Sequence, residues 1–266
     1  PGAVASTLEA MHRAHLLEKI IPVFATLRGL MQFNQYHKYT VDEHTILAVA
    51  KAEAIAQEPT VIGQVCQEMK RKDLLHLAIL LHDLGKGRKE DHCEVGKVIA
   101  EETAARLGCY ELETRTLVFL VHRHLLRAHT AFRRDPYDEK VLVPFAKAVG
   151  TPEVLRKLLA LTVADIAAVG PGVMTKWKES LLTELYLRTL PVVSGERETR
   201  RQILLYSILL APVGALPFLF GYAGAIYGAV SVVMGILFVI AAQRLRSAPA
   251  GEATERAGKS LFGYSI

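Results

Sequence analysis

The chain has 266 residues, of which 51% are hydrophobic, so it is long enough for one large domain or two small ones with a sizeable core. Its net charge of +5 lies mostly in residues 197–266, which hold 7 Lys/Arg and 3 Asp/Glu, and this indicates a membrane surface rather than nucleic acid as a partner. Three cysteines without zinc spacing argue against a disulfide framework and favour a reducing compartment. The chain begins with Pro-Gly and shows no signal peptide, as we expect of a piece of a longer protein.

Two helices are expected near the start of the chain. Apolar residues recur at helical spacing over residues 8–31, which predicts one packing helix with a kink at Pro22. Thr40 and Glu43 have the spacing of a capping box, so a second helix should begin directly after Thr40. His44 lies in the first turn of that helix, where an isolated histidine is more often half-exposed than a ligand.

Residues 74–86 form a dense apolar run that ends in an imidazole and a carboxylate, His82 and Asp83. The run predicts a buried helix, which Gly85 and Gly87 should end, so that the two polar side chains lie at the mouth of a pocket. Because such groups are costly to bury without a partner, a metal ion is indicated. For an isolated pair, a histidine–aspartate hydrogen bond in the core would be the simpler interpretation.

Basic side chains near these motifs are candidates for binding an anion. Lys86 and Arg88 follow the histidine–aspartate pair directly. Arg133 and Arg134 lie in a stretch, residues 128–140, that we expect to be a polar loop. The sequence leaves open whether this loop is merely solvated or clamps an anion.

Two further helices are expected after the pair. Residues 94–107 have an amphipathic pattern that Gly108 should end, and residues 112–126 should form the next helix. That helix would carry His122 and His124, which are two positions apart and cannot share one helical face. At most one of them should therefore point toward the site.

The last polar signal of the first part is Asp165, the single acid in an apolar run at residues 158–169. A buried lone carboxylate needs a cation or several donors nearby. With His44, His82 and Asp83, it gives two imidazoles and two carboxylates, a set that suits Mn²⁺, Mg²⁺, Fe²⁺ or Zn²⁺. Such an ion lowers the pKa of a bound water enough to supply the nucleophile of a phosphoester hydrolase.

This order of motifs, His then His-Asp then Asp in a helical context, resembles the HD-domain metal-dependent phosphohydrolases. The likeness is greater to the HD domain of the bifunctional uridylyltransferase/uridylyl-removing enzymes and covers about residues 8–190. The segments that carry it are MQFNQYHKYTVDEHT at residues 31–45, HDLGKG at 82–87, AFRRD at 131–135, TVAD at 162–165 and WKESLLTELY at 177–186.

The resemblance implies a phosphodiesterase that uses Mn²⁺ or Mg²⁺ to remove UMP from a tyrosine of the signal protein PII. It implies metal ligands at His44, His82, Asp83 and Asp165. From the positions of the motifs we further expect Asp83 and Lys86 to be catalytic and Lys86, Arg88, Arg133 and Arg134 to bind phosphate. His92 and His124 stand where related two-metal proteins have further ligands, whereas Arg123 replaces a histidine expected there. Neither the nucleotidyltransferase domain nor the ACT domains of that family are expected in this chain.

Residues 202–243 contain no charged side chain, which predicts two membrane-spanning helices with a turn at residues 221–224. Pro212 and Pro217 are tolerable in such helices. Arginines flank the run on both sides, and by the positive-inside rule both ends should lie in the cytoplasm of a bacterial cell, at the inner membrane. Two buried helices of a soluble core are the weaker alternative.

The tail also resembles the C-terminal membrane part of protoheme IX farnesyltransferase, over about residues 197–266. The segments that carry this likeness are TRRQILLYSILLAP at residues 199–212 and AGKSLFGYSI at 257–266. The Asp-rich motifs that bind diphosphate in such enzymes are missing, so prenyl transfer by this chain alone is not expected.

Together these observations predict an all-α protein. We expect an HD helical bundle at residues 1–195, a transmembrane hairpin at 196–246, and a polar loop with the start of a further span at 247–266. The principal hypothesis is a membrane-tethered phosphohydrolase. The alternatives are a fragment or joined product of a farnesyltransferase, and a metal-stabilised HD module without catalysis.

Overall fold

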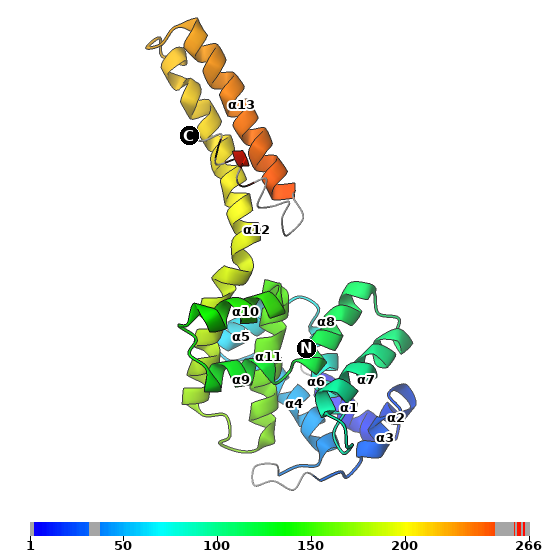
Figure 1. The fold of residues 1–266 in the computed structure, drawn as a ribbon. Coiled ribbons are helices and arrows are strands. Elements are labelled where there is room, and N and C mark those ends of the chain that lie inside the picture. Colours follow the sequence, from blue (N-terminus) through cyan, green and yellow to red (C-terminus); the bar gives the residue numbers. More distant parts are fainter. Residues whose placement is uncertain (1–2, 32–37, 248–257, 259, 262, 264–266) are drawn as a thin grey trace. The chain divides into compact units, whose positions relative to one another are not determined.

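The computed structural model describes residues 3–31, 38–247, 258, 260–261 and 263, and these residues form helices and no β-strand (Figure 1). The prediction of an all-α fold is confirmed. The elements are α1 Val4–Arg13, α2 Leu17–Ile20, α3 Phe24–Leu27, α4 Val41–Ile55, α5 Val61–Glu68, α6 Lys72–Leu81, α7 His92–Arg106, α8 Glu111–His122, α9 Leu126–Arg133, α10 Glu139–Val149, α11 Pro152–Val169, α12 Lys176–Leu219 and α13 Ala225–Ser247. The chain divides into two compact units, Pro1–Val193 and Ser194–Ile266. The motif residues 32–37 and most of the predicted polar loop and span at 247–266 lie outside the described residues.

The first unit is organised around α11, which packs against α4, α5, α6 and α8. α11 is apolar on nearly all sides, and Leu158, Leu159 and Leu161 are fully buried in it. α7 packs along α8, and α1 packs along α4. The arrangement places the last part of α11, which carries Asp165, beside the start of α4 and the end of α6.

The helix starts that flank these motifs are fixed by local capping. Thr40 and Glu43 form the predicted capping box, and α4 begins at Val41. α11 begins after Thr151, whose hydroxyl accepts a hydrogen bond from the Val154 N–H. The predicted start of α4 is confirmed. It could be predicted from sequence because capping depends on residues only a few positions apart.

The single kinked helix predicted for residues 8–31 is wrong. The chain instead forms α1, α2 and α3, and His15 between α1 and α2 has a positive φ of 57°. The Val4 and Ala5 N–H groups donate to the Glu53 carboxylate of α4, so α1 is held along that helix. The chain then reverses in order to bury further apolar side chains, Phe24 and Leu27 among them, in the same core.

The helix predicted at residues 112–126 is confirmed to His122 and wrong at residues 123–125, which form a turn. α8 ends at His122, and α9 begins at Leu126 and continues to Arg133, within the stretch expected to be a loop. α9 packs against α11. A continuous helix would carry residues 123–133 away from this core, so the break has a packing cause.

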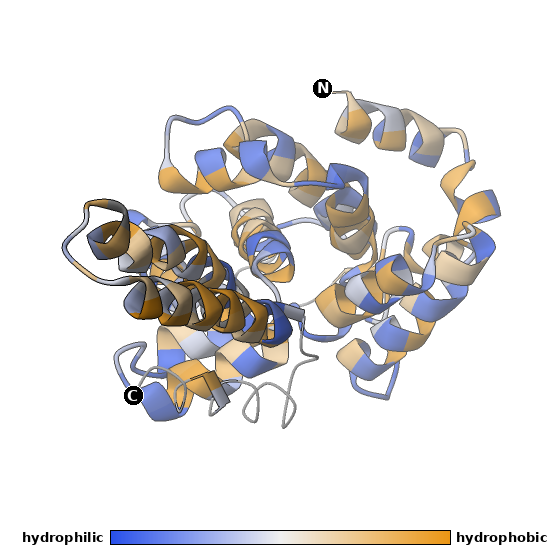
Figure 2. Cartoon of the chain, turned by 90° about the horizontal axis from the view of Figure 1, so that it is seen from above, coloured by the Kyte–Doolittle hydropathy of each residue, from blue (hydrophilic) through white to orange (hydrophobic). Residues whose placement is uncertain are grey.

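In the second unit, two helical segments are long and apolar enough to cross a membrane, Arg200–Phe218 in α12 and Ala225–Ser247 in α13. Both segments are coloured mostly as hydrophobic in Figure 2. Their apolar side chains are mostly exposed, for example Leu209 and Val233. The two segments contact each other through small residues: Ser231 Oγ donates to the Gly214 carbonyl at 2.7 Å. These exposed apolar helices confirm the predicted pair of candidate spans.

Candidate metal centre

Residues from α4, from the turn after α6 and from α11 meet in one buried cluster. His44 Nε2 lies 3.1 Å from Asp165 Oδ1, and His82 Nε2 lies 3.4 Å from the same oxygen. Asp83 Oδ2 lies 3.4 Å from His82 Nε2 and 3.7 Å from His44 Nε2. His44, His82 and Asp83 are each at most 3% exposed, and the Asp165 side chain is 19% exposed. The structure thus brings together all four residues that the sequence suggested as ligands.

The turn after α6 is shaped by glycine. α6 ends at Leu81, and Gly87 adopts a φ of +82°, a conformation that a side chain would strain. A Cβ atom on Gly85 would stand 2.1 Å from the His92 carbonyl oxygen, so only glycine allows the start of α7 to approach this turn. The predicted helix break therefore also brings His92 close to the turn that carries His82 and Asp83.

The ring of His82 is oriented by the backbone. Its Nδ1 lies 2.6 Å from the Ile79 carbonyl oxygen, which can only accept, so Nδ1 carries a hydrogen and donates. Its Nε2 is fully buried and makes no hydrogen bond among the described residues. A buried imidazole nitrogen that faces two carboxylates is the arrangement of a metal ligand whose other nitrogen is held by a second group.

The charges in the cluster are strongly coupled. Burial by itself would raise the pKa of Asp83 and of Asp165, but the neighbouring His82 holds both carboxyl groups well below their ordinary pKa. Burial would likewise lower the pKa of His82, but Asp83 and Asp165 raise it to about 10. The Lys86 ammonium lies 2.6 Å from Asp83 Oδ2 and adds a second positive charge. The two buried carboxylates therefore draw cations to this point.

The donor set fits a divalent ion. Ligand atoms bonded to one ion at about 2.0–2.2 Å stand roughly 3.0–3.5 Å apart in tetrahedral or octahedral geometry. The four distances among His44, His82, Asp83 and Asp165 run from 3.1 to 3.7 Å. Three of these side chains alone, His44, His82 and Asp83, form a group with metal-binding spacing.

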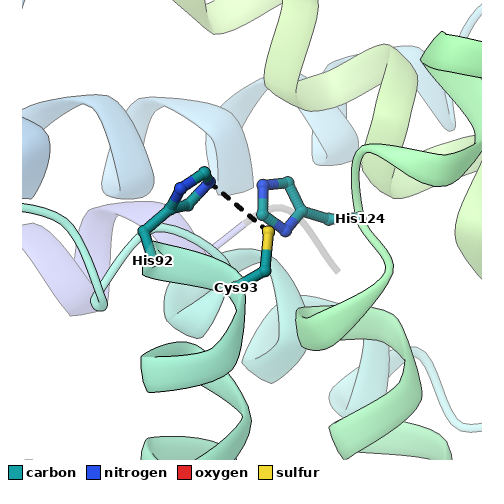
Figure 3. A group of neighbouring side chains, drawn as sticks. All are labelled: His92, Cys93 and His124. Carbon is teal, nitrogen blue, oxygen red and sulfur yellow. Dashed lines mark hydrogen bonds between the residues drawn. The ribbon is translucent and has the colours of Figure 1, made fainter. Parts of the chain in front are cut away.

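A second group of side chains lies beside the first. His92 and Cys93 open α7, and His124 lies in the turn between α8 and α9 (Figure 3). The ring of His124 stands 5.2 Å from that of His82 and 5.4 Å from that of His92, between centroids. Cys93 was missed at the sequence level because it has no cysteine partner at zinc spacing. Its position next to His92 at a helix start was the available signal.

Of the two neighbouring histidines, only His124 belongs to this group. His122 Nε2 pairs with Glu94 Oε1 at 2.7 Å, on the surface between α7 and α8. This agrees with the expectation that at most one of the two points toward the site.

Of the basic residues suggested for phosphate binding, only Lys86 contacts the cluster. Lys86 is largely buried against Asp83. Arg88 is exposed, as are Arg133 and Arg134 at the end of α9. Among the described residues, none of these three arginines has an ion pair or hydrogen bond from its side chain to the cluster.

The HD domain family matches residues 41–167, a range that contains every residue of both groups. Bifunctional uridylyltransferase/uridylyl-removing enzymes are similar to this chain. The enzyme of Azospirillum brasilense is 43% identical over 194 residues, which are 71% of this chain and 21% of that protein. Those of Novosphingobium aromaticivorans and Gluconobacter oxydans are 41% and 39% identical, over 68% and 74% of this chain and 20% and 22% of those proteins.

The chain thus spans about a fifth of the length of the curated relatives it matches. None of these comparisons supports the resemblance of the tail to farnesyltransferases, which stays a prediction from sequence. The buried histidine and aspartate cluster and the similarity to these enzymes have one explanation: this chain carries an HD domain, homologous to the HD region of bifunctional uridylyltransferase/uridylyl-removing enzymes.

Proposed function

We propose that this chain is a metal-dependent phosphohydrolase of the HD type. The observation that carries the proposal is the convergence of two imidazoles and two carboxylates, His44, His82, Asp83 and Asp165, in a buried site, with four imidazole-to-carboxylate distances of 3.1–3.7 Å. These four side chains hold the divalent ion. Mn²⁺ or Mg²⁺ suits the carboxylates, and Fe²⁺ or Zn²⁺ suits the imidazoles.

A divalent ion held there would lower the pKa of a water and offset charge on the phosphoester. The residues of the chain orient this chemistry. His82 Nδ1 is held by the Ile79 carbonyl, so that Nε2 faces the carboxylates of Asp83 and Asp165, with which it would hold the ion. Lys86, paired with Asp83 in the absence of substrate, is placed to stabilise the negative charge that develops on the phosphate.

The substrate we propose is a uridylyl group joined to a protein through a phosphodiester, as in uridylylated PII. Its support is the name of the aligned relatives, uridylyl-removing enzymes, together with the sequence resemblance of residues 8–190 to their HD domain. Another phosphodiester substrate at the same site is the alternative.

Hydrolysis by the purified full chain in detergent tests the proposal. Mn²⁺-dependent cleavage of bis-p-nitrophenyl phosphate reports the chemistry, and release of UMP from uridylylated PII reports the substrate. Asp83→Asn should lose both activities and the bound metal. Asp73→Asn, an exposed aspartate at the start of the helix that precedes the site, should keep them.

Each result has a distinct meaning. Cleavage of the synthetic diester without UMP release would support the phosphohydrolase activity and contradict uridylylated PII as its substrate. Metal bound by the wild type without cleavage of either compound would identify a metal-stabilised HD module that does no chemistry. A chain without metal and without activity would refute the proposal.

We also propose that the second unit tethers the chain to the bacterial inner membrane, with the HD domain on the cytoplasmic side. Support comes from the two exposed apolar segments, Arg200–Phe218 and Ala225–Ser247, and from arginines near both ends of the pair. The chain should then remain in the membrane fraction after an alkaline carbonate wash. Recovery in the soluble fraction would contradict the tether.

A further inference from the structure

We propose that the end of α9 and the first part of α12 form a docking surface for the body of a protein substrate that is itself acidic where it binds. The inference rests on the proposed function, because it names how the protein that carries the phosphodiester is held. This α9–α12 surface consists of Phe132, Arg133, Arg134, Tyr137, Trp177 and Arg188. It joins two segments that carry the sequence resemblance, residues 131–135 and 177–186, and that contribute nothing to the metal centre.

Aromatic contacts hold the two segments together. The rings of Phe132 and Trp177 are stacked, with 6.5 Å between their centroids and 20° between their planes. The Arg188 guanidinium lies over the Tyr137 ring, 3.4 Å from its centroid, and the Tyr137 hydroxyl donates to the Glu184 carboxylate. A partner therefore meets side chains that are already ordered, which lowers the entropy cost of binding.

A buried arginine also fixes α9 against α12. Arg127 is fully buried, and its Nη2 donates to the Leu182 carbonyl at 2.5 Å. Its Cζ lies 5.9 Å from the centroid of the Tyr186 ring, in the next turn of α12. The surface is therefore carried by two helices in a fixed relation.

The surface leaves large aromatic groups open to solvent. Trp177 is 65% exposed, and Tyr137 is 62% exposed. Tryptophan, tyrosine and arginine are the residues that most often dominate the binding energy of a protein interface. The exposure and composition of this surface are thus those of an interface rather than of a solvated helix face.

The charges favour an acidic protein over a membrane as the partner. Arg133 and Arg134 are exposed, and neither has an ion pair in the part of the chain that the structure describes. Unpaired guanidinium groups bind carboxylates well. A groove of about 750 Å³, lined by Arg188 and by Glu179 and Glu184 among others, runs along α12. A hollow with two glutamates suits a folded protein, whereas an anionic lipid surface attracts an unbroken run of basic residues.

The surface lies within reach of the metal centre for a bound protein. α9 begins two residues after His124, whose ring stands 5.2 Å from that of His82 between centroids. The eight residues of α9 span about 12 Å, whereas a small folded protein is about 30 Å across. A protein whose body rests on Trp177 can therefore present a phosphodiester on an exposed loop to the candidate ligands.

Steady-state kinetics of the purified full chain in detergent separate docking from chemistry. Trp177→Ala should raise KM for uridylylated PII by about 10- to 30-fold, the usual effect of truncating an aromatic residue at the centre of an interface, and leave hydrolysis of bis-p-nitrophenyl phosphate unchanged. Arg134→Glu should raise the same KM, and more so at low salt. Leu112→Ala, which truncates an exposed side chain on α8, should change neither activity. An unchanged KM in both surface variants would overturn the inference.

Trp177 also reports docking in the wild type, because it is the single tryptophan of the chain. With metal removed by chelation, so that nothing is cleaved, a uridylylated PII protein that lacks tryptophan should shift the Trp177 emission to shorter wavelength and protect it from quenching by acrylamide. An emission that responds to reconstitution into vesicles with phosphatidylglycerol, but not to PII, would overturn the inference in favour of a membrane contact. Failure of the wild type to cleave either compound would refute the proposed function instead, and the emission would still show whether the surface binds PII.

Discussion

At the scale of single residues, the imidazoles of His82 and His124 are held in the same way. Each Nδ1 donates to the backbone carbonyl three positions earlier, Ile79 for His82 and Val121 for His124. This contact fixes the orientation of each ring without help from another side chain, so that each Nε2 faces Asp83. The environment of these nitrogens decides what the cluster binds.

Lys86 should act on the rate rather than on metal binding. Its ammonium contacts Asp83 but cannot ligate an ion while protonated. We expect Lys86→Ala to keep the metal content and lower kcat by about 10²- to 10³-fold, the usual effect of removing one charge-stabilising donor. Lys86→Arg should retain part of the rate, and the exposed Lys89→Ala should retain all of it. Equal losses of kcat and of bound metal would contradict this role.

Binding of Mn²⁺ should release a proton from His82. Because the pKa of His82 is about 10 in the metal-free cluster, above its ordinary 6.5, the ring is protonated at neutral pH and must lose that proton to become a ligand. Below pH 10 the affinity should therefore rise with pH, by up to about tenfold per unit. Calorimetric titration in buffers of different ionisation enthalpy measures the protons released. A value of zero would show that His82 is neutral without the ion.

At the scale of elements, the turn after α6 and the start of α7 form one unit of the site. The turn carries His82 and Asp83, and the helix start carries His92 and Cys93. The two are in contact at Gly85, where the chain has no side chain to separate them. The close approach of these two groups of candidate ligands therefore requires a glycine at position 85.

Gly85→Ala should separate these elements. Its Cβ would meet the His92 carbonyl at 2.1 Å, a backbone atom that cannot rotate away. We expect a loss of about 1–3 kcal/mol in the free energy of unfolding, as for overpacked cores, together with weaker metal binding. Urea unfolding measures the free energy of unfolding, and a Co²⁺ titration measures metal binding. Gly195→Ala, inside α12 where a Cβ would meet nothing within 4 Å, is the control; it should leave metal binding unchanged and, as alanine in a helix, should not lower the free energy of unfolding.

At the scale of the whole molecule, the two units bury their apolar residues in different ways. The first unit has a continuous core of buried side chains, among them Leu81, Leu120 and Leu161. In the second unit only 11% of each candidate span is buried, so its apolar surface must be covered by something outside the described residues. Lipid is the covering that we propose.

Charges placed on that surface should release the chain from the membrane. Val232 and Ile236 are both exposed on α13. Arginine at the centre of a membrane helix costs about 2.5–3.5 kcal/mol, so Val232→Arg with Ile236→Arg should markedly reduce the fraction that survives a carbonate wash. Arg246→Lys, which keeps the basic flank, should leave that fraction unchanged. Unchanged retention of the double variant would show that the hairpin does not span the bilayer.

The sequence by itself determined those features that depend on residues close together in the chain. The start of α4 follows from capping residues within four positions, and the break after α6 follows from two glycines. His82, Asp83 and Asp165 were identifiable because polar side chains stand out in apolar runs, whereas His44 was recognised from the order of the motifs. The uncharged stretch likewise predicted the pair of apolar helices.

Only the tertiary structure decided how separate elements meet. Packing on α4 and α11 divided the predicted helices at residues 8–31 and 112–126, because continuous helices would leave the core. It also placed Cys93 beside His124, 31 positions later in the chain, and left Arg133 and Arg134 on the surface. These outcomes depend on which surfaces of distant helices are in contact, and no local pattern of residues specifies that.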